Sequence, residues 1–429
     1  NYNILKQLSP SPHSCPAPPL FAMESVMQES SLLVCLLCGL VAVLCFGFVR
    51  NYVKRGHFSA LMDLAEAVNG PTPKDLSERA EMISKLKAQA QPPLTPEEEL
   101  ARLDCSPVER FKFDDPEFLR YLDEHGYVVV DVGLSESRDK LAKLKSLLWD
   151  FLEASTPSRE SKGWKRDDPS TWDNEGMCSI GSCTSGIING KGVGHSEFNW
   201  EARTIPAVRK VFELIWGEED LITSFDGANV FRPWHPDDPA TCDRKTFGGW
   251  WHVDQGRRKA GARHAVQGLL SLFDQNETTG GLCVMPGSQF RHDEVVLFNT
   301  GTRDFVTVQP YFPGFHDMPR KLVSCKAGDL VLWDSRTIHC NTPAPKPLPP
   351  KAKGLFRLPA PELLRACAYI CITPRRMASA EVLRLRRCAF EAQITSSHWP
   401  HEVYLGSAGD ENQPKLDINS CGQARRLLI

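Results

Sequence analysis

The sequence has no long run of basic residues and no period typical of a repeat protein. Its 50 lysines and arginines are slightly outnumbered by 53 acidic residues, which gives a net charge of −3. Because nucleic-acid-binding domains concentrate positive charge, we expect no nucleic-acid partner. The missing repeat argues against a solenoid. Hydrophobic residues make up 41% of the chain, enough for an ordinary globular core.

A cysteine framework is also missing, although the chain contains 15 cysteines. The close cysteine pairs are not joined by a second pair, or by histidines at the spacing of a zinc finger. Structural disulfides and structural zinc are therefore not expected. Many unpaired thiols are typical of proteins in a reducing compartment.

The first 49 residues contain one long apolar run and no signal peptide of the cleavable type. We expect residues 1–31 to be a disordered leader, of which 1–22 precede Met23 and need not belong to the native protein. Residues 32–49 carry no charge and reach the length of a membrane-spanning helix. Basic residues, beginning with Arg50, follow the run. This pattern predicts a single-pass membrane anchor with a cytoplasmic catalytic domain.

The remaining sequence divides at about residue 108. Residues 50–107 are charged and interrupted by prolines, which indicates a helical, Pro-rich linker. In the folded domain, 108–429, apolar spacing predicts helices over 118–125 and 134–154 with a strand over 127–132 between them. After Leu221, short strands alternate with turns, as in an antiparallel sandwich or barrel. The predicted fold is mostly β with flanking helices.

The segment GGWWHVDQG places His252 and Asp254 two residues apart. On a strand both side chains project from the same face and could bind one metal ion. A distant histidine would complete a 2-His-1-carboxylate set, which suits iron(II) because it leaves coordination positions open. The best candidate is His339 in KAGDLVLWDSRTIH, although other histidines remain possible. Spacing alone also allows ordinary core or surface histidines. The other candidates are His264, His292, His316, His398 and His401.

The segments WWHVDQ, QGLLSLFDQNETTGGLCVMPGSQFRH and AGDLVLWDSRTIH, in this order, resemble the phytanoyl-CoA dioxygenase family. The resemblance covers roughly residues 110–400. It implies a double-stranded β-helix (jelly-roll) core and an enzyme that depends on iron(II), 2-oxoglutarate and O2. It also implies that His252, Asp254 and His339 are the metal ligands.

The family holds its cosubstrate with an arginine on a strand after the distal histidine, and Arg365 in RACAYICITP matches that position. A guanidinium is the natural bidentate partner of a carboxylate. A Pro-rich insertion before Arg365 departs from the family spacing and leaves Arg357 as a rival. Three further polar residues could line the pocket or form structural hydrogen bonds: Asn229, Arg232 and Gln267.

We therefore expect a 2-oxoglutarate-dependent dioxygenase that hydroxylates a C–H bond of a small-molecule or lipid-like metabolite. Related halogenating enzymes lack the carboxylate ligand, so Asp254 favours hydroxylation. The sequence contains no cluster of basic residues that stands out as a binding site for the phosphates of coenzyme A. Two alternatives remain: a catalytically inactive, membrane-tethered jelly-roll binding protein, and a cupin-like metal enzyme that is not an oxygenase. The sequence does not identify the substrate or the oligomeric state.

Overall fold

The computed structural model describes residues 73–156, 163–256, 259–298, 304–347, 362–402 and 405–408. The chain divides into two units, 1–76 and 77–429, and the second contains both large sheets. The α-helices of the described residues are α4 (Pro73–Gln89), α5 (Pro96–Ala101), α6 (Glu117–His125), α7 (Arg138–Ser155), α8 (Asn174–Ile180), α9 (Glu197–Arg203), α10 (Pro206–Trp216), α11 (His292–Leu297) and α12 (Ala380–Glu391).

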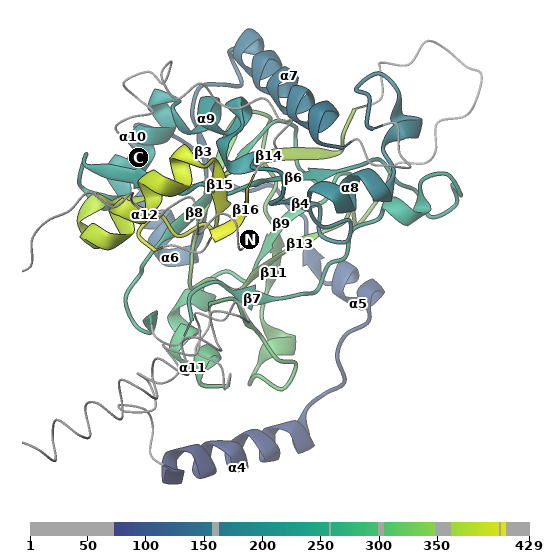
Figure 1. Cartoon of the computed structure of the whole chain (residues 1–429). Coiled ribbons are helices and arrows are strands. Elements are labelled where there is room, and N and C mark those ends of the chain that lie inside the picture. Colours follow the sequence, from purple (N-terminus) through teal and green to yellow (C-terminus); the bar gives the residue numbers. More distant parts are fainter. Residues whose placement is uncertain are drawn as a thin grey trace, which may run out of the picture. The chain divides into compact units, whose positions relative to one another are not determined.

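Two mixed sheets form the centre of the fold (Figure 1). The larger sheet runs β2-β3-β12-β8-β14-β6-β4, with β5 also paired to β14, and the smaller runs β1-β11-β9-β13-β7-β10. The larger sheet contains β2 (Arg110–Lys112), β3 (Tyr127–Asp131), β4 (Ile187–Ile188), β5 (Leu221–Thr223), β6 (Ala228–Phe231), β8 (Val266–Ser271), β12 (Asp329–Asp334) and β14 (Arg365–Pro374). The smaller contains β1 (Leu103–Asp104), β7 (His252–Val253), β9 (Gly281–Val284), β10 (Val306–Thr307), β11 (Arg320–Leu322) and β13 (His339–Thr342), while β15 (Ile394–Ser396) and β16 (Leu405–Ala408) pair with each other. The jelly-roll-like core agrees with the prediction, but the fold of the described residues mixes helices and strands and is not mostly β.

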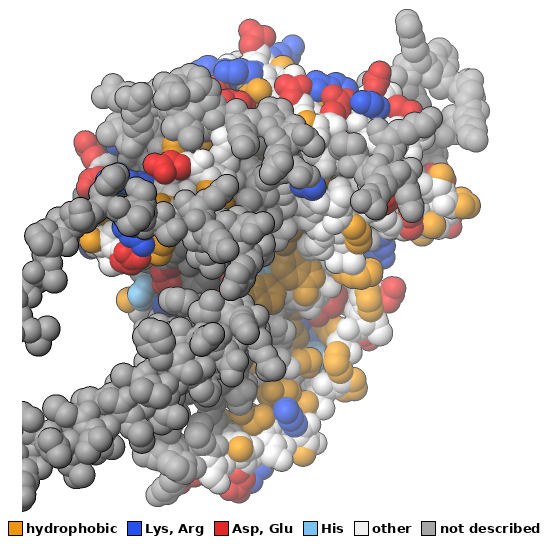
Figure 2. Space-filling view, viewed as in Figure 1, with side chains coloured by type: hydrophobic (Ala, Val, Ile, Leu, Met, Phe, Trp, Pro, Cys, Tyr) orange, Lys and Arg blue, Asp and Glu red, His pale blue; other side chains and the backbone are white. Residues whose placement is uncertain are grey.

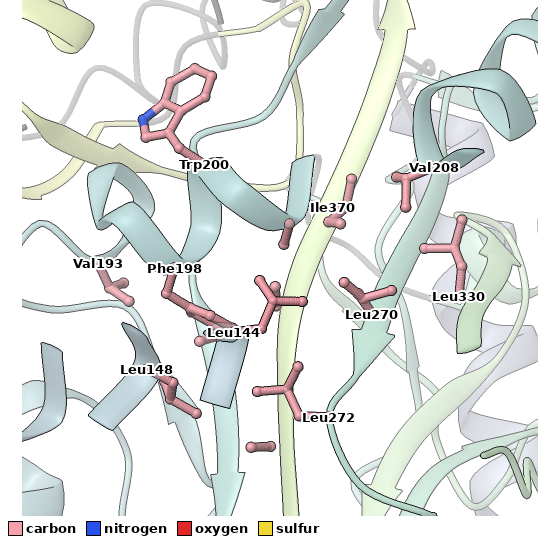
Figure 3. Close-up of a cluster of buried hydrophobic side chains, with 14 of the residues drawn as sticks. Leu144, Leu148, Val193, Phe198, Trp200, Val208, Leu270, Leu272, Leu330 and Ile370 are labelled. Carbon is pink, nitrogen blue, oxygen red and sulfur yellow. The ribbon is translucent and has the colours of Figure 1, made fainter. Parts of the chain in front are cut away.

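Helices cover the outer face of the larger sheet. Strand residues of even number, such as Leu270 and Ile370, pack there against Leu144 of α7, Phe198 of α9 and Val208 of α10 (Figure 3). The side-chain period of a strand is two, so the odd-numbered residues of β6, β8 and β14 point the other way. This alternation places Asn229, Gln267 and Arg365 on the inner face.

The inner faces of the two sheets share a separate apolar cluster. Leu269 and Val331 from the larger sheet pack with Leu282 and Val284 from the smaller one. Burial of these side chains between the sheets fixes the distance and angle between β8 and β13. Polar side chains on the same inner faces are therefore held in a rigid frame.

The local predictions before the site hold well. Helices α6 and α7 and strand β3 lie where apolar spacing predicts them. The turn before β12 depends on Gly328, whose φ of 94° is in the left-handed region, where a Cβ would also approach the Ser135 nitrogen to 2.8 Å. Within the predicted linker, 50–107, the structure forms α5 and β1, and β1 pairs in parallel with β11.

The prediction of a membrane anchor requires correction. No helix in the described part of the chain is long and apolar enough to span a bilayer. Residues 32–49, on which the prediction rests, lie outside the described residues. The run only just reaches the minimum length for a span, and length was its main support. The transmembrane helix, the membrane as a partner and the single-pass localisation are therefore withdrawn.

Candidate metal centre

Two neighbouring strands of the smaller sheet bring His252, Asp254 and His339 together. His252 on β7 is the direct antiparallel partner of His339 on β13, and Asp254 follows β7 by one residue. The Asp254 carboxylate lies 3.5 Å from His252 Nε2 and 3.1 Å from His339 Nε2. All three side chains are buried, and they form the one group in the described residues that could hold a metal ion. We call them the His-Asp-His cluster.

Backbone carbonyls fix the orientation of both imidazole rings. His252 Nδ1 lies 3.2 Å from the carbonyl oxygen of Trp250, and His339 Nδ1 lies 2.9 Å from that of Thr337. A carbonyl can only accept a hydrogen bond, so each Nδ1 carries the proton. Each Nε2 then presents its lone pair toward Asp254. Metal-binding histidines are oriented in the same way by their second ring nitrogen.

The electrostatics of the His-Asp-His cluster favour ligand forms that can bind a cation. Burial and the neighbouring His339 lower the pKa of His252, which favours the neutral imidazole. Burial tends to raise the pKa of Asp254, but His398, His252 and His339 stabilise the carboxylate whenever they carry a proton that faces it, and this holds that pKa well below its usual range. A buried carboxylate facing two neutral imidazoles needs a positive partner, which a divalent metal would supply.

Gln267 extends the site onto β8 of the larger sheet. Its Nε2 donates to Asp254 Oδ2 at 2.6 Å, and its side chain is buried. This contact is charge-assisted because the acceptor is a carboxylate. Gln267 thus contacts a predicted metal ligand, and the structure supports positioning of Asp254 rather than direct contact with a cosubstrate.

Arg365 lies fully buried at the start of β14, opposite Phe231 of β6. Its Nη1 donates to Asn229 Oδ1 at 3.0 Å, and Asn229 Nδ2 donates in turn to the carbonyl of Ser185. The Nε and Nη2 atoms of Arg365 have no hydrogen-bond partner among the described residues. Unpaired donors on a buried guanidinium are costly, and a ligand carboxylate would satisfy them. The arginine end of the site therefore fits 2-oxoglutarate.

The hydrogen-bond partners of Arg232 do not belong to the His-Asp-His cluster. Its Nη2 donates to Asn174 Oδ1 at 2.6 Å and its Nη1 to the carbonyl of Trp172 at 3.2 Å, and burial lowers its pKa to about 10. These contacts tie the end of β6 to the segment before α8. The structure thus gives Arg232 a structural role, and its predicted part in cosubstrate binding has no support here. The rival Arg357 lies outside the described residues.

Two aromatic side chains cover His252. Trp250 stacks on the His252 ring with centroids 5.0 Å apart, and Phe305 approaches the ring at 4.3 Å. The apolar rings exclude water from the imidazole. The tryptophan-rich segment before the HxD pair was a visible signal for Trp250. Phe305 lies in a loop whose sequence has no recognisable motif, so the sequence did not point to this residue.

The fold and the His-Asp-His cluster define a jelly-roll protein with a candidate mononuclear metal centre. The family model of phytanoyl-CoA dioxygenase matches residues 122–343, so the chain belongs to the phytanoyl-CoA dioxygenase family. Members of this family are iron(II)- and 2-oxoglutarate-dependent oxygenases and related enzymes. The resemblance expected from the sequence is confirmed, and the coarse class of enzyme follows from it.

The chain is also similar to individual proteins. The chain is 27% identical over 336 residues to "Ava biosynthesis cluster protein O" of Aspergillus versicolor, covering 75% of this chain and 96% of the relative. It is 24% identical over 260 residues to a "Putative phytanoyl-CoA dioxygenase" of Dictyostelium discoideum, covering 51% and 68%. Among solved structures, the epimerase SnoN in complex with Fe3+, alpha ketoglutarate and nogalamycin RO matches with a TM-score of 0.36 and 17% identity, covering 60% of this chain and 82% of SnoN.

Proposed function

We propose that this protein is an iron(II)- and 2-oxoglutarate-dependent dioxygenase that hydroxylates a C–H bond of a small molecule. One observation carries the proposal. The buried His-Asp-His cluster and the partly unpaired guanidinium of Arg365 both belong to the inner faces of the two sheets. The cluster fits a metal, and the guanidinium fits the distal carboxylate of a dicarboxylic acid.

In this proposal, His252, Asp254 and His339 would hold iron(II) as a set of two histidines and one carboxylate. When bound, iron(II) with 2-oxoglutarate and O2 supplies the oxidation of a substrate C–H bond, with succinate and carbon dioxide as the other products. Arg365 holds the far carboxylate of 2-oxoglutarate, and Asn229 fixes the guanidinium from behind at 3.0 Å.

The remaining residues keep the centre rigid and dry. Gln267 holds Asp254 through the 2.6 Å hydrogen bond, and the carbonyls of Trp250 and Thr337 hold the two imidazole rings. Trp250 and Phe305 shield His252 from solvent. No side chain needs to act as a general base, because the oxidation is the chemistry of the bound group.

The test is release of succinate from 2-oxoglutarate by the purified full chain in air, with iron(II) or zinc(II) added. We expect succinate with iron(II) and none with zinc(II), because zinc(II) has no redox chemistry. Turnover of a supplied metabolite without 2-oxoglutarate would instead indicate a metal enzyme that is not an oxygenase. A folded, iron-loaded protein that neither binds nor consumes 2-oxoglutarate would support a binding protein.

A further inference from the structure

Strand β14 runs from the predicted cosubstrate arginine to the metal end of the site. Arg365 begins the strand, and Cys371 is the direct partner of Gln267 on β8, which donates to Asp254. Successive strand residues rise by about 3.3 Å, so the inner row of β14 spans roughly 20 Å from Arg365 to Cys371. A side chain in the middle of this row therefore lies between the arginine and the metal ligands.

Tyr369 is the large polar side chain in the middle of this inner row. It packs with the apolar cluster between the two sheets, and its direct partner on β8 is the inward-facing Leu269. Tyr369 is also the one residue of β14 that is only partly buried, while the residues on both sides of it are buried. Because protein interiors are closely packed, an inward-facing ring keeps accessible surface only where the space beside it is open. Such a space is present between the sheets.

The hydroxyl group of Tyr369 reaches across to the smaller sheet. Asn341 Nδ2 lies 3.5 Å from Tyr369 Oη and donates to it. Asn341 follows His339 by two residues on β13, so both side chains point to the same face. The Tyr369 hydroxyl thus connects the strand of Arg365 with the strand of a predicted metal ligand.

The same hydroxyl has a proton to donate. A phenol can accept and donate, and the contact with Asn341 uses it as the acceptor. No acceptor for its proton is found among the described residues. Desolvation between the sheets, with a smaller effect of Cys367, raises the pKa of Tyr369, whereas the positive charge of Arg365 acts in the opposite direction. The hydroxyl therefore keeps its proton at neutral pH, and a ligand oxygen would satisfy it.

The inner space beside Tyr369 differs from a cavity of about 760 Å³ that is lined by α5, Phe247 and Trp250. Figure 2 shows hydrophobic side chains in a recessed part of the surface, in the area between the labels β13 and α5 of Figure 1. Three lining residues of the cavity belong to the face of the smaller sheet opposite the His-Asp-His cluster: Trp251, Cys283 and Cys340. Neither Tyr369 nor Arg365 lines that cavity. The donors of β14 therefore face the space between the sheets.

We propose that the Tyr369 hydroxyl is a second anchor for the distal carboxylate of 2-oxoglutarate, beside the guanidinium of Arg365. This inference rests on the proposed function, because it takes 2-oxoglutarate as the cosubstrate. A carboxylate has lone pairs for about four hydrogen bonds, so it can accept from the guanidinium and from the hydroxyl together. An O–H donor to a carboxylate forms a charge-assisted hydrogen bond. Tyr369 then helps the site to select a dicarboxylic over a monocarboxylic 2-oxo acid.

The test compares 2-oxoglutarate with 2-oxopentanoate, which has the same chain length and a methyl group in place of the distal carboxylate. Calorimetry on the manganese-loaded full chain gives the affinity for 2-oxoglutarate, and competition against it gives that for 2-oxopentanoate. Tyr369→Phe should weaken 2-oxoglutarate binding about tenfold, because one charge-assisted hydrogen bond is lost. Binding of 2-oxopentanoate and of manganese should stay within about twofold of wild type.

The matched control is Tyr121→Phe. Tyr121 packs against the same apolar cluster, and its hydroxyl bonds to that of Tyr127 at 3.2 Å. This variant removes a hydroxyl of the same chemistry outside the inner row of β14, so it should leave the affinities for both acids unchanged. Urea denaturation of both variants checks that they are folded.

Three outcomes would overturn the inference. If wild type binds 2-oxoglutarate and Tyr369→Phe binds it equally well, the role of Tyr369 is rejected and the oxygenase proposal stands. Equal weakening of both acids in Tyr369→Phe would give the hydroxyl a structural role and has the same consequence. A folded, manganese-loaded wild type that binds neither acid would reject this inference together with the proposed function.

Discussion

The two ends of the candidate site differ in how completely their polar atoms are satisfied. At the metal end, both Nδ1 atoms are bonded to carbonyls and Asp254 accepts from Gln267. At the other end, Arg365 has one bonded nitrogen and two without partners in the described structure. The first end is arranged before any ligand arrives, and the second keeps donors available for one. This difference separates a fixed metal frame from a cosubstrate anchor.

The largest predicted effect comes from breaking the metal end alone. His339→Ala should weaken iron(II) binding by more than about 100-fold, because even changes to the partners of metal ligands cost about 10- to 100-fold. The measurement is competition for iron(II) with a calibrated chelator under anaerobic conditions. His125→Ala is the control, since the His125 side chain is 43% exposed and outside the cluster. Unchanged iron affinity in His339→Ala would exclude His339 as a ligand.

The next effect comes from breaking the arginine end alone. Arg365→Met should weaken 2-oxoglutarate binding about 100-fold, because two charge-assisted hydrogen bonds of about 1.5 kcal/mol each are lost. Iron(II) affinity should stay within about threefold of wild type. Calorimetric titration of the manganese-loaded protein with 2-oxoglutarate gives the first value.

A second readout separates an anchor from a structural arginine. The free protein already holds the Arg365 guanidinium partly unpaired, so its loss should change the free energy of unfolding by no more than about 1 kcal/mol. A large loss of stability with normal 2-oxoglutarate affinity would show that Arg365 supports the fold instead.

A smaller effect is expected from the residue that supports Asp254. Gln267→Leu should weaken iron(II) binding about 10-fold, since it removes the 2.6 Å hydrogen bond but none of the ligands. The iron competition assay measures the change. Gln267→Glu should be worse than Gln267→Leu because a second carboxylate would face Asp254. The opposite ranking would mean that Gln267 does not act through Asp254.

The smallest effect on ligand binding is expected at Arg232, the buried arginine outside the site. Arg232→Met should leave iron(II) and 2-oxoglutarate affinities unchanged, because its donors bind Asn174 and Trp172. It should lower the free energy of unfolding by about 2 kcal/mol through the lost charged hydrogen bonds. Urea denaturation measures the stability. Weaker 2-oxoglutarate binding at normal stability would restore Arg232 to the site.

Much of the site could be predicted because it lies on strands. The HxD spacing places His252 and Asp254 on one face, and the family pattern points to His339 and Arg365. The same period of two separates Asn229 from Arg232, which lie on opposite faces of β6 and its extension. The alternation of side chains along a strand could therefore have separated Asn229 from Arg232 on the sequence alone.

Other features had no readable signal. Strand β1 contains two residues, which is too short for an apolar pattern, and its pairing with β11 depends on contacts far along the chain. Phe305 reaches His252 through a backbone conformation that its residue type does not favour. The cavity lined by α5, Phe247 and Trp250 is formed by segments that are far apart in the sequence. Its shape could therefore not be predicted before the fold was known.

The most direct test of the account is an anaerobic titration of the full chain with iron(II) and 2-oxoglutarate, for wild type and His252→Ala. The account predicts a weak visible charge-transfer band in wild type, because 2-oxoglutarate binds iron held by the His-Asp-His cluster. The variant should lose the band while it remains folded. A folded, iron-loaded wild type without the band would contradict the oxygenase assignment of this site.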